Sequence, residues 1–392
     1  MQPLAGLTVV ALEQAVAAPL ASRHLADLGA RVIKIERPGT GDFARGYDRA
    51  VRGLSSHFVW LNRGKESVTL NVKHPAGRAI LAQLVARADV FVHNLAPGAV
   101  ERLGFGAAEL LARHPRLIVC AVSGYGRGGP YAAKKAYDLL IQAESGLMAV
   151  TGTPDEPVKV GISVADIATG MYAALGILGA LYQRTVTGRG TVVEIAMLDA
   201  LGEWMGYPAY YTAYGGTAPP RTGAHHATIA PYGPYPVGDG AWVFVAVQND
   251  REWRAFCAEV LEAPALAEDP RFRTNPDRVR HRAELDAVIR AAWATATVAA
   301  VTARLEAARI AYARQNTVEE FWQHPQLAAR DRWRMVPSPV GPLRMLRPPW
   351  VSADEAEPVG AVPALGEHTA AVLQELGYDA AARAALKADG VI

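Results

Sequence analysis

Apolar positions along the first 200 residues alternate between two spacings, and the two spacings predict strands and helices in turn. Short, β-branched apolar runs predict strands at Leu7–Leu12, Arg31–Glu36, Val90–His93, Leu117–Ser123 and Thr191–Met197. Helical spacing predicts helices at Pro19–Leu28, Pro75–Arg87 and Ala107–Arg113, and a long helix after Asp166. This alternation is typical of a parallel sheet with helices on both faces, so we predict an α/β fold.

The pattern changes after residue 204. Residues 205–240 are rich in Gly, Pro and Tyr and predict a linker or an active-site loop. Further on, a strand is expected at Ala241–Gln248, and helices at Arg251–Val260, Arg282–Ala292, Thr297–Ala308, His368–Leu376 and Ala380–Ala388. We therefore expect a large domain over 1–204, a linker and loop over 205–240, a smaller α+β domain over 241–330, and a Pro-rich return segment with C-terminal helices over 331–392 that packs on the large domain.

Composition narrows the class of protein. The chain has 392 residues, of which 51% are hydrophobic and 20% charged, so it can bury a large core, and its length favours about two domains. Its 40 basic and 38 acidic residues argue against binding to nucleic acid. The N-terminus lacks the basic region of a signal peptide, and the apolar run Met171–Tyr182 is too short to span a bilayer. Two cysteines suit a reducing compartment, so we expect a cytoplasmic protein without a membrane partner.

Basic residues follow several predicted strands. Arg37, Lys73, Arg102 and the pair Lys134 and Lys135 all lie at or just beyond such strand ends. Open α/β sheets bind ligands outside the carboxyl ends of their strands. These cations could therefore converge on one anionic, phosphate-bearing ligand, although their spacing fits scattered surface side chains equally well.

Asp166 is the most informative single residue. It stands at the start of an apolar helical segment, where a carboxylate is most often a plain N-cap. The alternative is a desolvated nucleophile that forms a covalent acyl intermediate. Gly124–Pro130 indicates a flexible loop over a ligand, because no helix opens directly after its glycines. His225 and His226 have no Cys or carboxylate at ligand spacing, so no metal site is expected.

Seven segments, in this order, make the chain resemble the class III CoA-transferases, the family of formyl-CoA transferase, carnitine CoA-transferase and α-methylacyl-CoA racemase. They are LADLGARVIKIERPGTGD, SVTLNVKHPAGR, VFVHNLAPGAVERLGFG, SGYGRGGP, AYDLLIQAESGLMAVTG, ISVADIATGMYAALGILGALYQRTVTGRG and PALGEHTAAVLQELGY. The resemblance covers essentially the whole chain. It implies a Rossmann-like large domain, a smaller domain and an interlocked homodimer.

The resemblance also implies residue roles. The catalytic aspartate corresponds to Asp166. The cations that hold the CoA nucleotide correspond to Arg37, Lys73, Arg102 and Lys135. Contacts to the adenine and the pantetheine arm correspond to Leu70, Asn71, Val72, Asn94 and Leu95. The loop over the thioester corresponds to Val16 and Ala17, and positions near the thioester correspond to Tyr137 and Asp138. The resemblance implies a CoA thioester as substrate, with no tightly bound cofactor and no metal.

The activity implied is transfer of CoA between carboxylic acids through an aspartyl-CoA thioester. Val16 stands where the formyl-CoA enzymes have Gln, and their glycine-rich flap is replaced here, which argues against formyl or oxalyl exchange. The segments AYDLLIQAESGLMAVTG and RTGAHHATIAPYGPY look most like enzymes for C4–C5 dicarboxylates (mesaconate, itaconate, citramalate, malate and succinate), such as mesaconyl-CoA C1–C4 transferase and succinyl-CoA:citramalate transferase. Transfer between two acids and transfer within one diacid both remain open.

Two alternative functions stay open, and so does the identity of the residue that binds the far carboxylate of a diacid. A racemase of this family would have a His at the position of Tyr137, and tyrosine, with a pKa of about 10, is a poor general base at neutral pH. The other alternative is a non-catalytic CoA-binding protein. The candidates for binding the far carboxylate of a diacid are Arg45, Arg49, Arg52, Arg221, His225 and His226.

Overall fold

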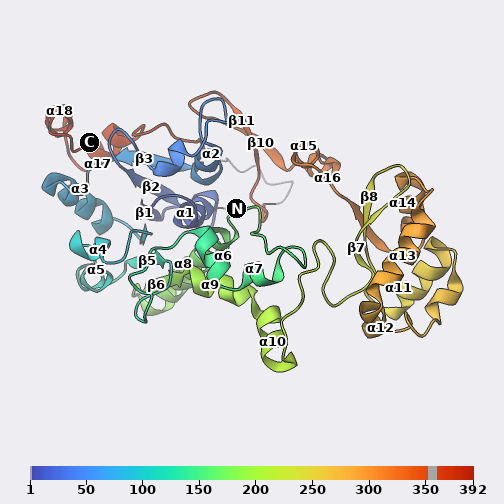
Figure 1. Ribbon diagram of the computed structural model, residues 1–392. Helices are drawn as coiled ribbons and strands as arrows, with labels where there is room; N and C mark the ends of the chain where they lie inside the picture. The colour runs from blue at the N-terminus through green and yellow to red at the C-terminus, as the bar shows by residue number, and fades with distance from the viewer. Residues whose placement is uncertain (1, 352–359) are drawn as a thin grey trace. The chain divides into compact units, whose positions relative to one another are not determined.

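The computed structural model describes residues 2–351 and 360–392, so part of the expected return segment, residues 352–359, lies outside the described residues. The chain divides into two compact units (Figure 1). Unit 1 comprises Met1–Ser145, Gly161–Met205 and Pro325–Ile392, and unit 2 comprises Gly146–Val160 and Gly206–His324. Each unit has its own sheet and its own core.

Unit 1 is built on a six-stranded parallel sheet. Its strands are β1 (Thr8–Leu12), β2 (Arg31–Glu36), β3 (Lys65–Thr69), β4 (Val90–His93), β5 (Ile118–Ser123) and β6 (Val192–Ala196). Their order across the sheet is β3-β2-β1-β4-β5-β6, and every neighbouring pair is parallel. This is the strand order of a Rossmann-type sheet, in which the order reverses between β1 and β4. The α/β prediction is confirmed, and ligands of such sheets bind at that reversal.

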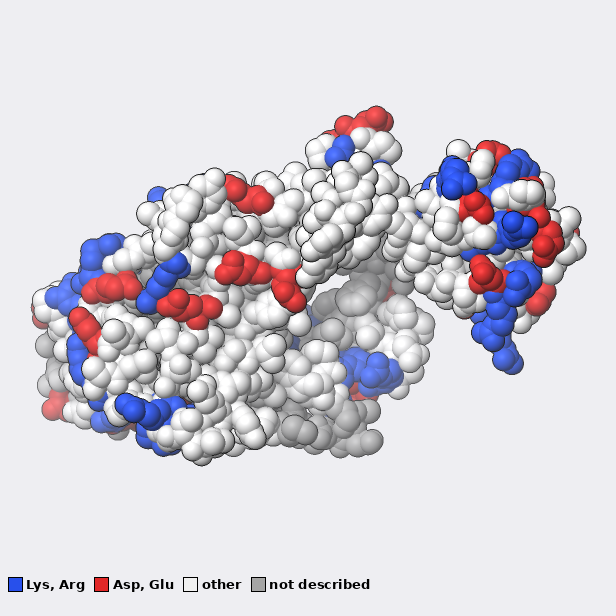
Figure 2. Space-filling view, turned by 90° about the horizontal axis from the view of Figure 1, so that it is seen from below, with Lys and Arg blue, Asp and Glu red and all other residues white. Residues whose placement is uncertain are grey.

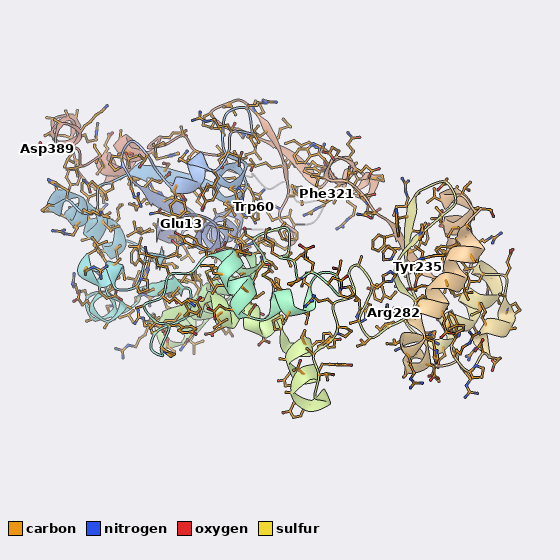
Figure 3. All side chains as sticks on the ribbon, in the orientation of Figure 1. Glu13, Trp60, Tyr235, Arg282, Phe321 and Asp389 are labelled. Carbon is orange, nitrogen blue, oxygen red and sulfur yellow. The ribbon has the colours of Figure 1, made fainter. Side chains whose placement is uncertain are left out.

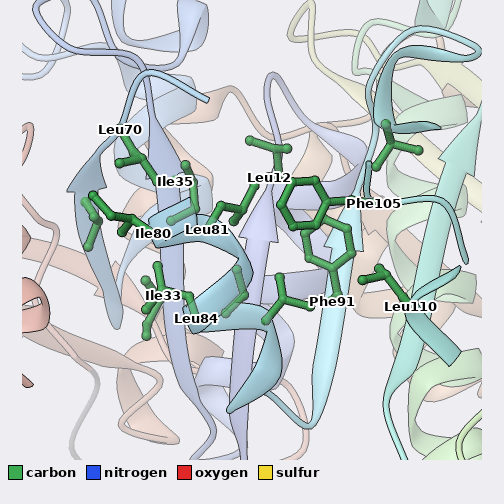
Figure 4. Packing of buried hydrophobic residues seen from close by; sticks show 14 of the residues in the cluster. Leu12, Ile33, Ile35, Leu70, Ile80, Leu81, Leu84, Phe91, Phe105 and Leu110 are labelled. Atoms are coloured by element: carbon green, nitrogen blue, oxygen red, sulfur yellow. The ribbon is translucent and has the colours of Figure 1, made fainter. Parts of the chain in front are cut away.

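Helices cover both faces of this sheet because its strands are apolar on both sides. Val10 and Leu12 pack under α3 (Pro75–Ala86) with Phe91 and Phe105. Figure 4 shows Leu12 beside the two phenylalanine rings. Val9 and Ala11 point to the other face, where α1 (Ala17–Asp27) and α8 (Val164–Thr187) lie. Because side chains alternate along β1, this one strand contributes residues to the core on each face of the sheet.

The helices α1 and α8 pack closely on that second face. A Cβ on Gly170 of α8 would lie 2.6 Å from the carbonyl oxygen of Ala17, at the start of α1. The lack of a side chain at Gly170 lets the two helices approach there. By length and composition alone α8 could cross a membrane, and half of its apolar stretch is buried inside the fold. The run Met171–Tyr182 is thus part of a helix twice its length.

The remaining elements of unit 1 flank the sheet. They are η1 (Phe43–Gly46), α2 (Ser56–Asn62), α4 (Ala99–Arg102), α5 (Ala107–Arg113), α6 (Asp138–Glu144), α9 (Met197–Trp204), α16 (Pro325–Ala329), β10 (Trp333–Val336), β11 (Leu343–Leu346), α17 (Thr369–Glu375) and α18 (Ala380–Ala388). The Pro-rich return segment expected over 331–392 begins as an antiparallel hairpin of β10 and β11. Val372 and Leu373 of α17 join the core under α3.

Unit 2 is a three-stranded antiparallel sheet packed against helices. Its elements are α7 (Leu147–Val150), α10 (Gly206–Gly215), β7 (Tyr232–Pro236), β8 (Trp242–Ala246), α11 (Asp250–Ala255), η2 (Phe256–Val260), η3 (Pro264–Ala267), α12 (Asn275–Arg280), α13 (Arg282–Trp293), α14 (Val298–Ala307), β9 (Ala311–Arg314) and α15 (Val318–Trp322). Buried aromatic rings of Tyr235, Trp253 and Trp293 fill its core, and the Tyr235 hydroxyl donates to Asp286 at 2.8 Å. Tyr235 and Arg282 are marked in Figure 3.

Residues 205–240 are not loop alone. They contain α10 and β7, and β7 pairs with β8 in the unit 2 sheet. Composition misled here because Gly, Pro and Tyr are weak helix formers, and α10 has no buried residue that an apolar stripe could reveal.

Candidate active site

Asp166 lies in the first turn of α8 and is half-buried. It does not cap its own helix, as the N-cap residue is Ser163. Instead Asp138, the first residue of α6, accepts the backbone N–H groups of Ala165 at 2.8 Å and Asp166 at 3.3 Å. The plain N-cap interpretation of Asp166 is therefore wrong. Because Asp138 accepts these N–H groups, the Asp166 carboxylate is not needed as the cap of α8.

The surroundings of Asp166 disfavour its charged form. Burial raises the pKa of Asp166, the nearby charge of Asp138 raises it further, and a backbone hydrogen bond from Ala17 opposes them, so that the pKa is about 7. The Ala17 N–H belongs to the first residue of α1, and a helix N-terminus favours negative charge beside it. Asp166 thus combines a reactive carboxylate with a donor suited to an oxyanion.

A turn at Gln14–Ala17 connects β1 to α1 and reaches Asp166. Asn94, directly after β4, clamps its first residue: its Oδ1 accepts the Gln14 N–H at 2.9 Å and its Nδ2 donates to the Gln14 carbonyl at 2.8 Å. Val16 is 4% exposed and packs with Leu20, Leu61 and Ile167, the residue after Asp166. The expected site residues Val16, Ala17 and Asn94 therefore position one another at this turn.

A cavity of about 420 Å³ lies at the carboxyl ends of β1, β2, β3 and β4. Its lining includes three of the expected cations, Arg37, Lys73 and Arg102. The expected contact residues Leu70, Val72 and Leu95 also line it, and Asn71 lines an adjoining cavity of about 450 Å³ with Arg37 and Lys73. Three positive charges around an apolar floor suit an elongated ligand with phosphate groups.

The other expected residues lie on the segment between β5 and α6. Lys135 is exposed and lies in a stretch without regular structure, while Lys134 pairs with Glu144. Tyr137 is 63% exposed and immediately precedes α6. Asp138 is bound at Ala165, as above, and its Oδ2 also accepts the side chain of Gln142 at 2.7 Å. Tyr137 and Asp138 therefore flank Asp166, whereas Lys135 does not line the cavity.

The structure separates the candidates for binding a far carboxylate. The Arg45 guanidinium donates two bonds of 2.8 Å to Glu36, and Arg52 donates to the carbonyls of Val340 and Pro342. Arg49 is exposed, and its guanidinium has no hydrogen bond or ion pair to any of the described residues. Of these three arginines, Arg49 is thus the one whose charge is available.

The three candidates in unit 2 are held by that unit. Arg221 donates to the carbonyls of Thr153 and Pro154, each at 2.8 Å. His225 packs against Tyr235, and His226 stacks on Tyr232. Within residues 2–351 and 360–392, no group of His, Cys, Asp and Glu side chains is arranged to hold a metal ion.

Two residues that sequence reasoning missed lie beside the turn. Gln14 lines the cavity and accepts the Arg37 guanidinium at 3.4 Å. Asp42 accepts the Ala15 N–H at 3.1 Å. The available signal was the segment IERPGTGD, whose Asp follows a glycine with a φ of +68° that closes a tight turn.

The cation-lined cavity lies at the reversal of a Rossmann-type sheet, and Gln14 of the turn that packs beside Asp166 lines it. This arrangement suits an enzyme that transfers a group carried on an anionic nucleotide. Comparison with known proteins agrees: the sequence profile of CoA-transferase family III matches residues 4–369. The chain belongs to this family and is a CoA-transferase, an enzyme class that uses CoA thioesters as substrates.

Relatives of known activity match over most of their length. The chain is 34% identical to succinyl-CoA:glutarate CoA-transferase of Mus musculus over 100% of this chain and 91% of that protein. It is 38% identical to acetyl-CoA:oxalate CoA-transferase of Acetobacter aceti, over 84% and 85%. It is 35% identical to succinyl-CoA–D-citramalate CoA-transferase of Chloroflexus aurantiacus, over 96% and 94%. A crystal structure of a CaiB/BaiF family protein from Brucella suis matches with a TM-score of 0.83 and 35% identity, over 95% of this chain and 99% of that chain.

Proposed function

We propose that this CoA-transferase moves CoA between dicarboxylic acids of four or five carbons through a covalent thioester on Asp166. The observation that carries the proposal is the half-buried Asp166 carboxylate in the first turn of α8, beside Asp138, with a pKa of about 7. A carboxylate that is desolvated but still ionised at neutral pH is a competent nucleophile.

The reaction balances without ATP or metal. One Asp166 oxygen attacks the acyl carbon of the donor thioester, and the C–S bond breaks. This step releases CoA thiolate and forms a mixed anhydride between Asp166 and the donor acid. The thiolate then attacks the aspartyl carbon and releases the donor acid as a carboxylate. The acceptor carboxylate attacks the resulting aspartyl-CoA thioester and expels the thiolate again. Attack of that thiolate on the acceptor's acyl carbon gives the new acyl-CoA and restores Asp166.

The residues around Asp166 suit these steps. Each attack places negative charge on a carbonyl oxygen, and the Ala17 N–H at the start of α1 is aimed at the carboxylate where that charge develops. Arg37, Lys73 and Arg102 hold the nucleotide part of CoA, far from the reacting bonds. Their contribution is the same in every step, so it favours binding more than chemistry.

Support for a dicarboxylate substrate comes from the relatives and from Arg49. The mouse and Chloroflexus relatives are named for transfer between succinyl-CoA and a second diacid, glutarate or citramalate. Arg49 lies two residues after Tyr47, whose pKa is raised to about 12 by burial and by the nearby charges of Asp42 and Asp166. Tyr47 is therefore near Asp166, and Arg49 can pair with the far carboxylate of an acid bound there.

We also propose that the enzyme is a homodimer. An exposed apolar stripe on α8 supports this assembly. Met171, Leu175, Tyr182 and Val186 are 52%, 62%, 75% and 75% exposed and recur at helical spacing. Figure 2 shows charges of both signs spread over one face, with much of unit 1 on that face uncharged. Light scattering after gel filtration should give twice the chain mass, and a monomer would refute the assembly.

One mass-spectrometric assay tests the reaction. Succinyl-CoA and, separately, mesaconyl-CoA are incubated with the enzyme and a panel of free mono- and dicarboxylates, and new acyl-CoA masses are recorded after chromatography. We expect new thioesters of C4–C5 diacids, and a CoA adduct on Asp166 in the intact protein. Asp166→Ala should reduce transfer at least 1,000-fold, which is about 4 kcal/mol.

The control is Asp199→Asn, an exposed aspartate in the first turn of α9. It should leave turnover within about twofold of the wild type. New thioesters of monocarboxylates alone would refute the substrate class. Substantial turnover by Asp166→Ala would refute the covalent route.

A further inference from the structure

We infer that Asp42 is a positioning residue for the transfer reaction, because it holds the Gln14–Ala17 turn against the first turns of α8, where Asp166 lies. The inference rests on the proposed role of Asp166. It starts from four charged side chains buried beneath the turn, which the transfer chemistry above does not use: Glu13, Lys34, Asp42 and Lys65, exposed by 1%, 0%, 1% and 3%. Glu13 lies inside unit 1, just after β1 (Figure 3).

These four side chains form a chain of alternating opposite charges in the order Asp42, Lys34, Glu13 and Lys65. Lys34 Nζ donates to Asp42 Oδ2 at 2.8 Å and to Glu13 Oε1 at 3.3 Å, and Lys65 Nζ donates to Glu13 Oε1 at 2.7 Å. The two carboxylates and the two ammonium groups balance. A buried ion network is costly to desolvate and adds little stability compared with apolar packing of the same volume. We therefore ask which part of the backbone this ion network holds in place.

Asp42 links this network to the turn. While Lys34 holds its Oδ2, its Oδ1 accepts the Ala15 N–H at 3.1 Å and the Ala44 N–H at 2.9 Å. Ala15 has a φ of +65°, in the left-handed region that residues other than glycine seldom occupy. Such a conformation persists only where the surroundings impose it, and here Asp42 binds the N–H of the strained residue itself.

The conformation of Ala15 sets the direction in which the chain enters α1. Asn94 fixes Gln14 on one side, and two residues beyond Ala15 the Ala17 carbonyl lies against α8 at Gly170, one turn after Asp166. Val16, between them, packs with Ile167. Release of Ala15 would therefore move the Ala17 N–H relative to the carboxylate. A misplacement of about 1 Å near reacting atoms can cost about 100-fold in rate.

The test compares Asp42→Asn with Asp27→Asn. Asp27 is a matched control because it is also buried and ion-paired: its carboxylate accepts Arg63 Nε at 2.9 Å and Nη2 at 2.8 Å, but it lies at the far end of α1. Both variants should lose thermal stability. The one amide oxygen of Asp42→Asn cannot accept from both Lys34 and Ala15; when it faces the charged Lys34, its NH2 faces the Ala15 N–H and releases it. Asp42→Asn should therefore lower kcat about 10- to 100-fold while KM for the acyl-CoA changes less than about threefold. Asp27→Asn should leave kcat within about threefold.

A second pair keeps the inference testable if Asp42→Asn does not fold. Ala15→Gly retains the N–H and permits a positive φ, so kcat should stay within about threefold. Ala15→Pro has no N–H and cannot adopt that φ, so kcat should fall at least about tenfold. Wild-type kcat in folded Asp42→Asn, or in Ala15→Pro where Asp42→Asn is unfolded, would overturn the inference. Turnover by the wild-type enzyme tests the proposed function separately.

Discussion

Asp138 Oδ1 accepts the backbone N–H of Asp166 at 3.3 Å, so two carboxylates lie close together at the start of α8. The same side chain caps the helix and disfavours ionisation of Asp166 through its negative charge. Asp138 therefore influences both the position of the Asp166 nucleophile and its pKa. Burial is the larger cause of the shift, and Asp138 adds to it.

Activity should depend on pH through Asp166. The nucleophile must be ionised, and its pKa in the folded enzyme is about 7. Since protonation removes the nucleophile, kcat/KM for the acyl-CoA should be constant above about pH 8 and fall about tenfold per pH unit well below pH 7. A pH series of initial rates with succinyl-CoA measures this midpoint.

Asp138→Asn is the informative companion to that series. The amide keeps an acceptor for the Ala165 N–H but removes the charge, so the midpoint should move to lower pH. A midpoint unchanged in this variant would contradict the electrostatic coupling of the two carboxylates.

Asp166 should also make the free enzyme less stable at neutral pH than at acid pH. Its pKa is 3.8 in a model compound and about 7 in the fold, so the unfolded chain ionises first as the pH rises, and folding loses free energy between these values. Asp166→Asn should therefore raise the free energy of unfolding by up to about 4 kcal/mol at pH 8, with no gain below about pH 4. Urea unfolding at both pH values measures the difference.

The exposed Glu203 of α9 provides the comparison for that experiment. Glu203→Gln should change the free energy of unfolding by less than about 0.5 kcal/mol. If Asp166→Asn is no more stable than the wild type at pH 8, the carboxylate is not strained by its burial.

The sequence predicted the sheet well because its signals are local. Arg31–Glu36 alternates and is β-branched, and it forms a strand with the predicted bounds. The long helix was expected after Asp166 and begins two residues before it. Each of these features depends on side chains within about one element length, and such patterns survive in a single sequence.

The site was predicted less completely because it depends on contacts between distant segments. Asp42 and Ala15 are 27 residues apart, and Asp138 and Asp166 are 28 apart. Periodicity cannot reveal which backbone N–H a distant carboxylate accepts. Asp166 and the cations stood out in the sequence with other interpretations open, and the family resemblance implied their roles, whereas the role of Asp138 as the cap of α8 appears only in three dimensions.

Two helical glycines of unit 1, Gly170 of α8 and Gly202 of α9, should respond oppositely to the same substitution. A Cβ at Gly170 would meet the Ala17 carbonyl oxygen at 2.6 Å, and backbone there can move only by shifting the start of α1. Gly170→Ala should thus cost about 1–3 kcal/mol of stability and lower kcat. Gly202 of α9 has nothing within 4 Å of its added Cβ, so Gly202→Ala should stabilise that helix by up to about 1 kcal/mol. The test measures the thermal unfolding and the kcat of both variants. Equal effects of the two substitutions would refute the close approach of α1 and α8 at Gly170.

The cavity cations should govern binding rather than chemistry. Arg37→Ala, Lys73→Ala and Arg102→Ala each remove one charge from the cavity lining. We expect KM for the acyl-CoA to rise about tenfold, and kcat to stay within about threefold, in steady-state assays. Arg113 on α5 pairs with Glu109 on the surface, so Arg113→Ala should change neither constant. A fall in kcat at unchanged KM would place these cations at the reacting centre instead.

Arg49 should select dicarboxylates. Its guanidinium has no partner among the described residues. Arg49 follows Tyr47 by two residues in the chain, and the charge of Asp166 contributes to the raised pKa of Tyr47. Arg49→Ala should raise KM about tenfold for succinate as acceptor, about 1.4 kcal/mol, and leave KM for butyrate, which lacks the second carboxylate, within about threefold. Arg52→Ala is the control, because that guanidinium donates to the carbonyls of Val340 and Pro342, and both KM values should stay near those of the wild type. An equal rise of KM for succinate and butyrate would show that Arg49 does not recognise the far carboxylate.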